Sequence, residues 1–155
     1  MKSTICKIAI SVILSCFILF PLSAKQLFVS PEGDDSADGS SSGNAFKTMS
    51  KAVDAAEEGD EIVLLGIIDI SQEPADKIYN SDAYNKNNQG VKILDKGLTI
   101  SGDPNQTRTK TGFTGNKTTT CLRLDGLNKK VTIRNLSIKE GNPTSDKGAG
   151  CFIRN

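Results

Sequence analysis

The acidic residues next to predicted strands are the first candidates for chemistry. Glycosidases generally use two carboxylates held about 5–9.5 Å apart across the sugar. Asp95, Asp103 and Asp125 lie nearest the predicted strands, but each is in a turn or beside Gly, where Asp is common for backbone reasons. Arg123 and Arg134 are predicted to point from strands into solvent, with no acidic cluster beside them. We therefore predict no catalytic site and no cofactor.

A second candidate is a calcium-binding loop. The first half of the D-x-[DN]-x-[DN]-G pattern is matched by Asp34, Ser36 and Asp38, with Ser in the second ligand position. The twelfth position is Ala45, where such a loop places a bidentate Glu. An ordinary polar loop is therefore the favoured interpretation, with calcium binding as the alternative.

Histidine and cysteine usage limits the chemistry further. The chain has no His, which removes the usual general base and the commonest zinc ligand. Two of its cysteines, Cys121 and Cys151, lie beyond the N-terminal apolar segment, and each begins a predicted strand. Two buried free thiols are the favoured prediction, and a disulfide is the alternative if the two cysteines fall on neighbouring coils.

The N-terminus is typical of a secretory signal peptide over residues 1–24. Lys2 and Lys7 precede an apolar run, and Ala24 provides the small residue for cleavage before Lys25. The run is shorter than the roughly 20 residues that span a bilayer. The alternatives are an uncleaved anchor and a lipoprotein cut before Cys16. The formal net charge of +1, without a basic stripe, argues against nucleic acid as a partner.

Residues 25–60 are predicted to form a strand, a polar loop and one short helix. The strand covers residues 26–31, and a Gly-rich polar loop covers residues 32–44. Thr48 is the predicted N-cap of the helix and Gly59 its C-terminal stop. A helix would place Met49, Ala52, Val53 and Ala56 on one apolar face.

Residues 61–155 alternate between short strands and turns. The predicted strands are 61–65, 67–70, 91–94, 98–100, 121–124, 131–133, 136–138 and 151–153, and two polar insertions lie at 71–90 and 103–120. Leu98 and Leu122, like Val131 and Phe152, are separated by twenty-odd residues, a spacing typical of solenoids. Asn135 is predicted to bend the chain between two sheets in a left-handed backbone conformation.

These patterns predict an all-β, right-handed parallel β-helix of about three coils, incomplete at its C-terminal end. The N-terminal helix is expected to cap the first coil, because an open coil exposes an apolar core and unpaired backbone groups. An antiparallel sandwich is the alternative fold, but it would use longer strands and more two-residue hairpin turns.

The motifs also resemble a known family. The segment 28–60, FVSPEGDDSADGSSSGNAFKTMSKAVDAAEEGD, resembles the opening segment of the pectate-lyase-like β-helix superfamily. The units VTIRNLSIKEGN and GAGCFIRN resemble coils of polymorphic outer-membrane and adhesin-like surface proteins of bacteria. The resemblance implies the β-helix fold, which carries polysaccharide lyases, glycosidases and non-catalytic passengers alike.

We therefore expect an exported, non-enzymatic surface or secreted protein, at the cell surface or outer membrane or in the periplasm. Its expected partners are glycans or proteins of a host or cell surface, and the part after the signal peptide is not expected to span a membrane. The open last coil predicts either a fragment of a longer protein or self-association. The alternatives are the N-terminal part of a carbohydrate-active enzyme that lacks its catalytic coils, and a decayed gene.

Overall fold

The computed structural model describes residues 23–74, 90–94, 96–125, 128–141 and 150–154. Within these ranges the chain forms one α-helix and three sheets in which every strand pair is parallel. The first sheet has the strand order β1 (Gln26–Val29), β2 (Glu61–Leu64), β5 (Thr99–Gly102), β8 (Thr132–Arg134). The second has the order β3 (Ile67–Asp69), β6 (Gly112–Thr114), β9 (Ser137–Lys139), and the third β4 (Val91–Leu94), β7 (Leu122–Asp125), β10 (Cys151–Arg154).

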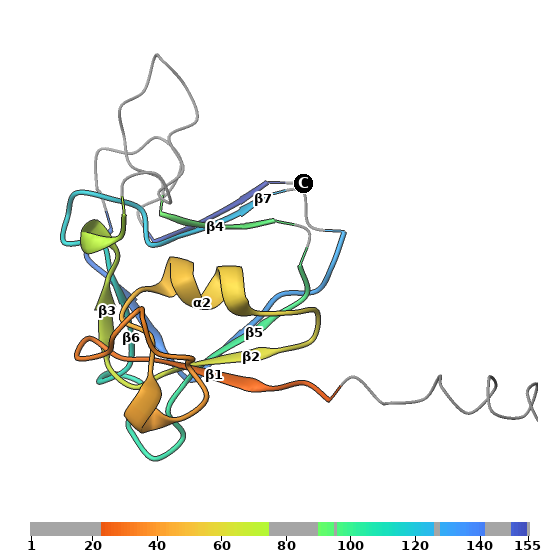
Figure 1. The fold of residues 1–155 in the computed structure, drawn as a ribbon. Helices are drawn as coiled ribbons and strands as arrows, with labels where there is room; N and C mark the ends of the chain where they lie inside the picture. The colour runs from red at the N-terminus through yellow and green to blue at the C-terminus, as the bar shows by residue number, and fades with distance from the viewer. Residues whose placement is uncertain (1–22, 75–89, 95, 126–127, 142–149, 155) are drawn as a thin grey trace, which may run out of the picture.

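The chain visits the three sheets in the same order three times. It passes from β2 to β3 to β4, then from β5 to β6 to β7, and finally from β8 to β9 to β10. Figure 1 looks at this arrangement from the end where α2 lies, with the three sheets around the helix. The prediction of short strands in parallel sheets is therefore confirmed, and the antiparallel alternative is wrong.

The core consists of apolar side chains stacked from one strand to the next. In the first sheet the register aligns Leu27, Ile62, Ile100 and Ile133. Ile62 and Ile100 are fully buried, whereas Ile133 is 36% exposed because no strand among the described residues pairs with the outer edge of β8. In the second sheet Ile138 lies in register with the buried Phe113 and is also 36% exposed.

Asn135 bends the chain between β8 and β9, as predicted. Its φ of 51° lies in the left-handed region, which Asn adopts more readily than most residues. The single residue therefore shifts the alternation of inward and outward side chains as the chain passes from one sheet to the next.

The helix α2 (Met49–Ala55) begins where the sequence predicts and ends earlier. Thr48 is the N-cap, and its hydroxyl accepts a hydrogen bond from the Lys51 N–H at 3.3 Å. The C-cap is Ala56, so the prediction that Gly59 stops the helix is wrong. Gly59 does adopt a φ of 89°, but in the turn before β2, where its N–H donates to the Gly97 carbonyl.

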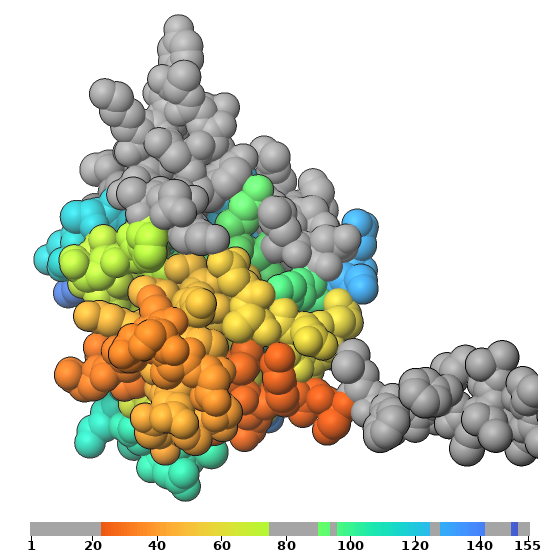
Figure 2. All heavy atoms as spheres, viewed as in Figure 1, coloured from red at the N-terminus to blue at the C-terminus, as the bar shows by residue number. Residues whose placement is uncertain are grey.

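The apolar face of α2 packs into the core beside β1 and β4. Met49 and Ala52 are fully buried, and Val53 is nearly so. The Lys96 Nζ donates to the carbonyls of Val53 and Ala56 at 2.8 and 2.7 Å, which satisfies orphan acceptors at the C-terminal end of the helix. In Figure 2 the atoms of residues 23–64, coloured orange to yellow, cover much of this end of the molecule.

Two details of the predicted strand pattern are wrong. The segment 103–120 was expected to be a polar insertion, but it contains β6 with the fully buried Phe113. The predicted twenty-odd-residue spacings also join strands of different sheets, since Leu98 precedes β5 and Leu122 begins β7. The true partners are Thr99 with Thr132 and Leu122 with Cys151, so the repeat is longer and irregular.

Candidate functional site

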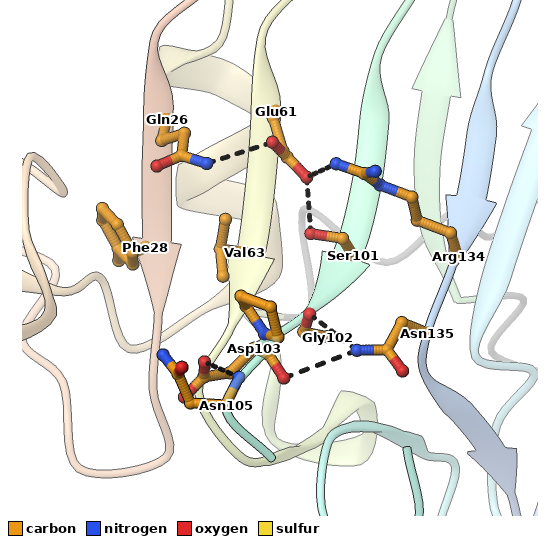
Figure 3. A pocket seen from close by; sticks show the side chains of 11 residues that line it. Gln26, Phe28, Glu61, Val63, Ser101, Gly102, Asp103, Asn105, Arg134 and Asn135 are labelled. Carbon is orange, nitrogen blue, oxygen red and sulfur yellow. Dashed lines mark hydrogen bonds and ion pairs between the residues drawn. The ribbon is translucent and has the colours of Figure 1, made fainter. Parts of the chain in front are cut away.

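A hollow with polar and apolar lining lies on the outer face of the sheet that contains β1, β2, β5 and β8. Its volume is about 390 Å³, and we call it the outer-face hollow. Strand alternation points every second side chain of this sheet away from the core. The register aligns one such row across the four strands: Phe28, Val63, Ser101 and Arg134. Figure 3 shows this row together with the turn residues that complete the lining.

Glu61 organises one rim of the outer-face hollow. Its carboxylate accepts hydrogen bonds from Gln26 Nε2 at 3.1 Å and Ser101 Oγ at 2.7 Å, and it is ion-paired with Arg134 at 2.6 Å (Figure 3). Partial burial alone would raise the pKa of Glu61, but the hydrogen bonds from Ser101, Arg134 and Gln26 together with the Arg134 charge lower it. Glu61 is therefore a fixed carboxylate, which suits binding better than proton donation.

The opposite rim is formed by the turn after β5 and by the bend before β9. Asp103 accepts a hydrogen bond from the Asn105 N–H at 2.8 Å. The Asn135 side-chain amide donates to the carbonyls of Gly102 and Asp103 at 3.4 and 3.5 Å. These contacts hold Asn105 and Asn135 at the lower edge of the hollow in Figure 3.

An apolar strip separates the two rims. Phe28 is half-buried on the outer face, Val63 lies beside it in register, and Pro104 is exposed in the turn after β5. The outer-face hollow is therefore amphipathic, with an apolar floor between two rows of hydrogen-bonding groups.

A second, more open hollow adjoins the first. It has a volume of about 1020 Å³ and shares Gln26, Phe28 and Glu61 with the outer-face hollow. Its other lining residues come from the start of β1, the Ser-rich part of the loop, the turn before β2 and the start of β5. They include Lys25, Asp38, Ser40, Ser41, Ser42 and Thr99. The two hollows together form a groove across the sheet.

Of the two acidic candidates that the structure describes, one lies at this site. Asp103 lines the outer-face hollow. Asp125 ends β7 in a different sheet, and Asp95 lies outside the described residues. Sequence reasoning missed Glu61. The sequence does not give the register of β2, β5 and β8, and only that register brings Glu61 close to Arg134.

The two arginines compare differently with the prediction. Arg134 is exposed as predicted, and it pairs with a single carboxylate, Glu61, which sequence reasoning did not identify. Arg123 is fully buried, and the prediction that it faces water is wrong. Its neighbours Leu122 and Leu124 point into the core, so alternation places Arg123 on the opposite face of the third sheet.

The carboxylates of the weak calcium candidate form hydrogen bonds within their own loop. Asp34 accepts a hydrogen bond from the Ser36 N–H at 2.8 Å, and Asp38 accepts from the Ser40 N–H at 3.0 Å and from the Ser40 hydroxyl at 2.7 Å. The backbone hydrogen bond from Ser36 lowers the pKa of Asp34. Within the part of the chain that the structure describes, no group of three His, Cys, Asp or Glu side chains could hold a metal ion.

Asp35, between the calcium candidates, has a structural role that the sequence did not reveal. Its carboxylate accepts hydrogen bonds from the N–H groups of Lys47 and Thr48, both at 2.9 Å, and from the Thr48 hydroxyl at 2.8 Å. The polar loop is thereby fastened to the start of α2.

Glu73 is a second carboxylate at the start of α2, and it is nearly fully buried. It accepts hydrogen bonds from the N–H groups of Met49 and Ser50, at 2.6 and 3.0 Å, and from the Ser50 hydroxyl. Burial raises the pKa of Glu73 against the effect of these hydrogen bonds, and the nearby Asp35 charge raises it further. Glu73 also lines a small hollow of about 130 Å³ next to Ile68.

Cys121 and Cys151 are free thiols in the structure. Cys151 begins β10 as predicted, whereas Cys121 lies one residue before β7, so the prediction that Cys121 begins a strand is wrong by one residue. Cys151 is in register with Leu122, the residue that follows Cys121. Burial raises the pKa of Cys121 to about 12, with smaller effects from Cys151 and Asp69. Its thiol therefore stays protonated and behaves as a small apolar side chain.

The signal-peptide prediction falls mostly on residues 1–22, which lie outside the described residues. Ala24 and Lys25, at the predicted cleavage site, are exposed ahead of β1. None of the helices in the described ranges has the length and apolar character needed to cross a membrane.

No protein-family model matches the chain, and no curated protein matches its sequence.

Proposed function

We propose that this chain is an exported, non-enzymatic segment of a right-handed parallel β-helix that displays its outer faces at a cell surface, as adhesins and passenger domains do. The observation that carries the proposal is the order of the strands: three parallel sheets are visited in the same sequence three times. Crossovers between parallel strands are right-handed in about 98% of cases. Stacked parallel strands form rigid surfaces well suited to display.

The motif resemblance to pectate-lyase-like and adhesin-like β-helix proteins supports this proposal. So does α2, whose apolar face covers core residues beside β1 and β4, as the end cap of a solenoid does. Export is supported by the basic start, apolar run and small residue of segment 1–24.

The state of Glu61 favours binding over catalysis. A general acid needs a pKa near the working pH, whereas the donors around Glu61 lower its pKa and occupy its oxygens. The groove therefore presents polar side chains that are already fixed in position by contacts with one another, and a polar partner can bind to them. Glycans or proteins of a cell surface are the partner classes that we propose.

A second candidate function is the N-terminal part of a carbohydrate-active enzyme. It is favoured by one observation, that the carboxylates of Glu61 and Asp103 line the same hollow. Glycosidases need two carboxylates across the sugar.

Export is tested by expressing the full chain in a Gram-negative host, separating the cell fractions and determining the N-terminal residue by mass spectrometry. We expect a product that begins at Lys25 in an exported fraction. A Leu14→Lys variant, which interrupts the apolar run, should remain in the cytoplasm with Met1 retained. Recovery of the unprocessed wild-type chain from the cytoplasm would refute export.

Catalysis is tested with the purified chain on neutral and acidic polysaccharides, by measuring new reducing ends and unsaturated products. We expect no cleavage above that of a Glu61→Gln, Asp103→Asn double variant. Cleavage by the wild-type chain that the double variant lacks would establish the enzyme alternative and contradict the display proposal.

A further inference from the structure

We infer that the outer-face hollow binds a neutral oligosaccharide. The inference names a ligand class for the display surface proposed above and rests on that proposal for its biological setting. Its physical basis is the hollow itself, with a volume of about 390 Å³. Ligand pockets commonly measure about 300–1,000 Å³.

The lining matches the two kinds of surface that a sugar ring presents. Phe28 on the floor and Pro104 in the turn beside it offer apolar surface, against which the C–H face of a pyranose can pack. Rows of polar groups lie on both sides of that floor, with Gln26 and Glu61 on one rim and Asn105 and Asn135 on the other (Figure 3). Sugar hydroxyls both donate and accept hydrogen bonds, so they can use amides on both rims.

The rims are preorganised, so ligand binding orders few side chains. Glu61 is held by Gln26, Ser101 and Arg134 at 2.6 to 3.1 Å. Asn135 is held by its two bonds to backbone carbonyls. Among the described residues, the Asn105 side-chain amide forms no hydrogen bond and remains for a ligand, as does the side-chain Oδ1 of Asn135. Preorganisation lowers the entropic cost of binding.

The charges favour a neutral ligand over an acidic one. The outer-face hollow contains two carboxylates, Glu61 and Asp103, and one cation, Arg134, which is already paired with Glu61. In the adjoining hollow Lys25 and Asp38 offset each other. A uronate carboxylate would therefore face an excess of negative charge, whereas neutral hydroxyls would not.

The groove also favours an extended ligand over a single sugar. The two hollows share Gln26, Phe28 and Glu61, so a chain that fills the first continues into the second. The second hollow adds the exposed hydroxyl side chains of Ser40, Ser41 and Ser42.

The test is isothermal titration of the purified chain with neutral tetrasaccharides built from glucose, mannose, galactose or xylose, and with tetragalacturonate as the charged comparator. At least one neutral tetrasaccharide should bind, and tetragalacturonate should bind at least about tenfold more weakly. Phe28→Ala and Asn105→Ala should each weaken neutral binding by about tenfold. Asn128→Ala, which removes the same amide from an exposed position outside the lining, should leave binding unchanged.

Thermal melting of each variant separates loss of fold from loss of binding, and the exposed Asn105 position keeps the test valid if Phe28→Ala unfolds. The inference is overturned if no neutral tetrasaccharide binds at about 10 mM, if tetragalacturonate binds as tightly, or if both variants bind like the wild type. Binding of an extended peptide that Phe28→Ala abolishes, without sugar binding, would assign the groove to protein instead. None of these results bears on export, so the two proposals fail separately.

Discussion

At the scale of single residues, Glu73 stands out because its carboxyl group is buried against the first turn of α2. Burial raises its pKa in the folded chain above the ordinary value of 4.5. A raised pKa means that Glu73 favours folding most when it is protonated, at pH values below about 4.5, and that this contribution is lost as the pH rises through the folded-state pKa.

We therefore predict that the free energy of unfolding of the wild type, relative to Glu73→Gln, falls between pH 4 and pH 7. The amide keeps an acceptor oxygen for the Met49 N–H and cannot ionise. Urea unfolding at several pH values, followed by circular dichroism, measures this difference. A difference that grows with pH would show that the hydrogen bonds from Ser50 and Met49 outweigh burial.

Glu61 should show the opposite dependence. Its pKa is lowered in the folded chain, so its contribution to stability is present at neutral pH and lost as the pH falls through the folded-state value. The free energy of unfolding of the wild type, relative to Glu61→Gln, should therefore fall from pH 6 to pH 3. The same urea titrations measure both variants. If the free-energy difference between wild type and variant changed with pH in the same direction for Glu61→Gln and Glu73→Gln, one of the two pKa directions would be wrong.

At the scale of the elements, Asp35 joins the polar loop to the helix. Its three accepted hydrogen bonds satisfy donors of Lys47 and Thr48 just ahead of α2. Asp35→Ala should lower the free energy of unfolding by about 1–2 kcal/mol, since it leaves these donors unpaired. Asp34→Ala is the matched control, because the exposed Asp34 carboxylate accepts a hydrogen bond only within its own turn, and no change in melting temperature is expected. Equal losses for the two variants would contradict the anchoring role.

The elements with strong local signals were predictable from the sequence. The apolar face of α2 and the capping hydroxyl of Thr48 follow helical spacing, and both are observed. β6 was missed because Gly112–Thr114 contains a single large apolar residue within a polar segment. Its strand character comes from parallel pairing with β3 and β9, which local sequence does not encode.

The candidate site was less predictable than the fold. Glu61 and Arg134 are separated by 73 positions and meet only because β5 lies between β2 and β8 in a defined register. Polar insertions of unequal length interrupt the repeat, so the sequence spacing could not supply that register. The alternation of residues in β8 predicted that the Arg134 side chain points outward, but it did not predict that Arg134 pairs with Glu61.

At the scale of the whole molecule, stability should decline along the stack from buried to open positions. Ile100 and Ile133 are the same residue type in adjacent register positions, but Ile100 is fully buried and Ile133 is 36% exposed. Ile100→Ala should cost about 2–5 kcal/mol of unfolding free energy, and Ile133→Ala less than about 1.5 kcal/mol. Chemical denaturation at concentrations where the chain is monomeric measures both costs. Equal costs in the monomer would contradict the exposure of Ile133 at the end of the stack.

The outer edges of β8, β9 and β10 are unpaired among the described residues, and Ile133 and Ile138 are exposed at that end. Unpaired strand edges beside apolar side chains promote edge-to-edge association. The opposite end is covered by α2, so two copies would meet through their open ends and close as a dimer with two-fold symmetry rather than extend into a fibre. The chain should therefore show a mass that rises with concentration and reaches a plateau at twice the monomer mass.

Ile133→Lys should suppress this dimer, because burying the new charges between two copies is costly. Thr132→Lys adds the same charge one residue earlier, where the side chain points to the outer face of the sheet, and should leave the dimer intact. Multi-angle light scattering over a hundredfold concentration range distinguishes the cases. Growth beyond the dimer, or equal loss of association in both variants, would place the contact on an outer face of the sheets instead of on the open end.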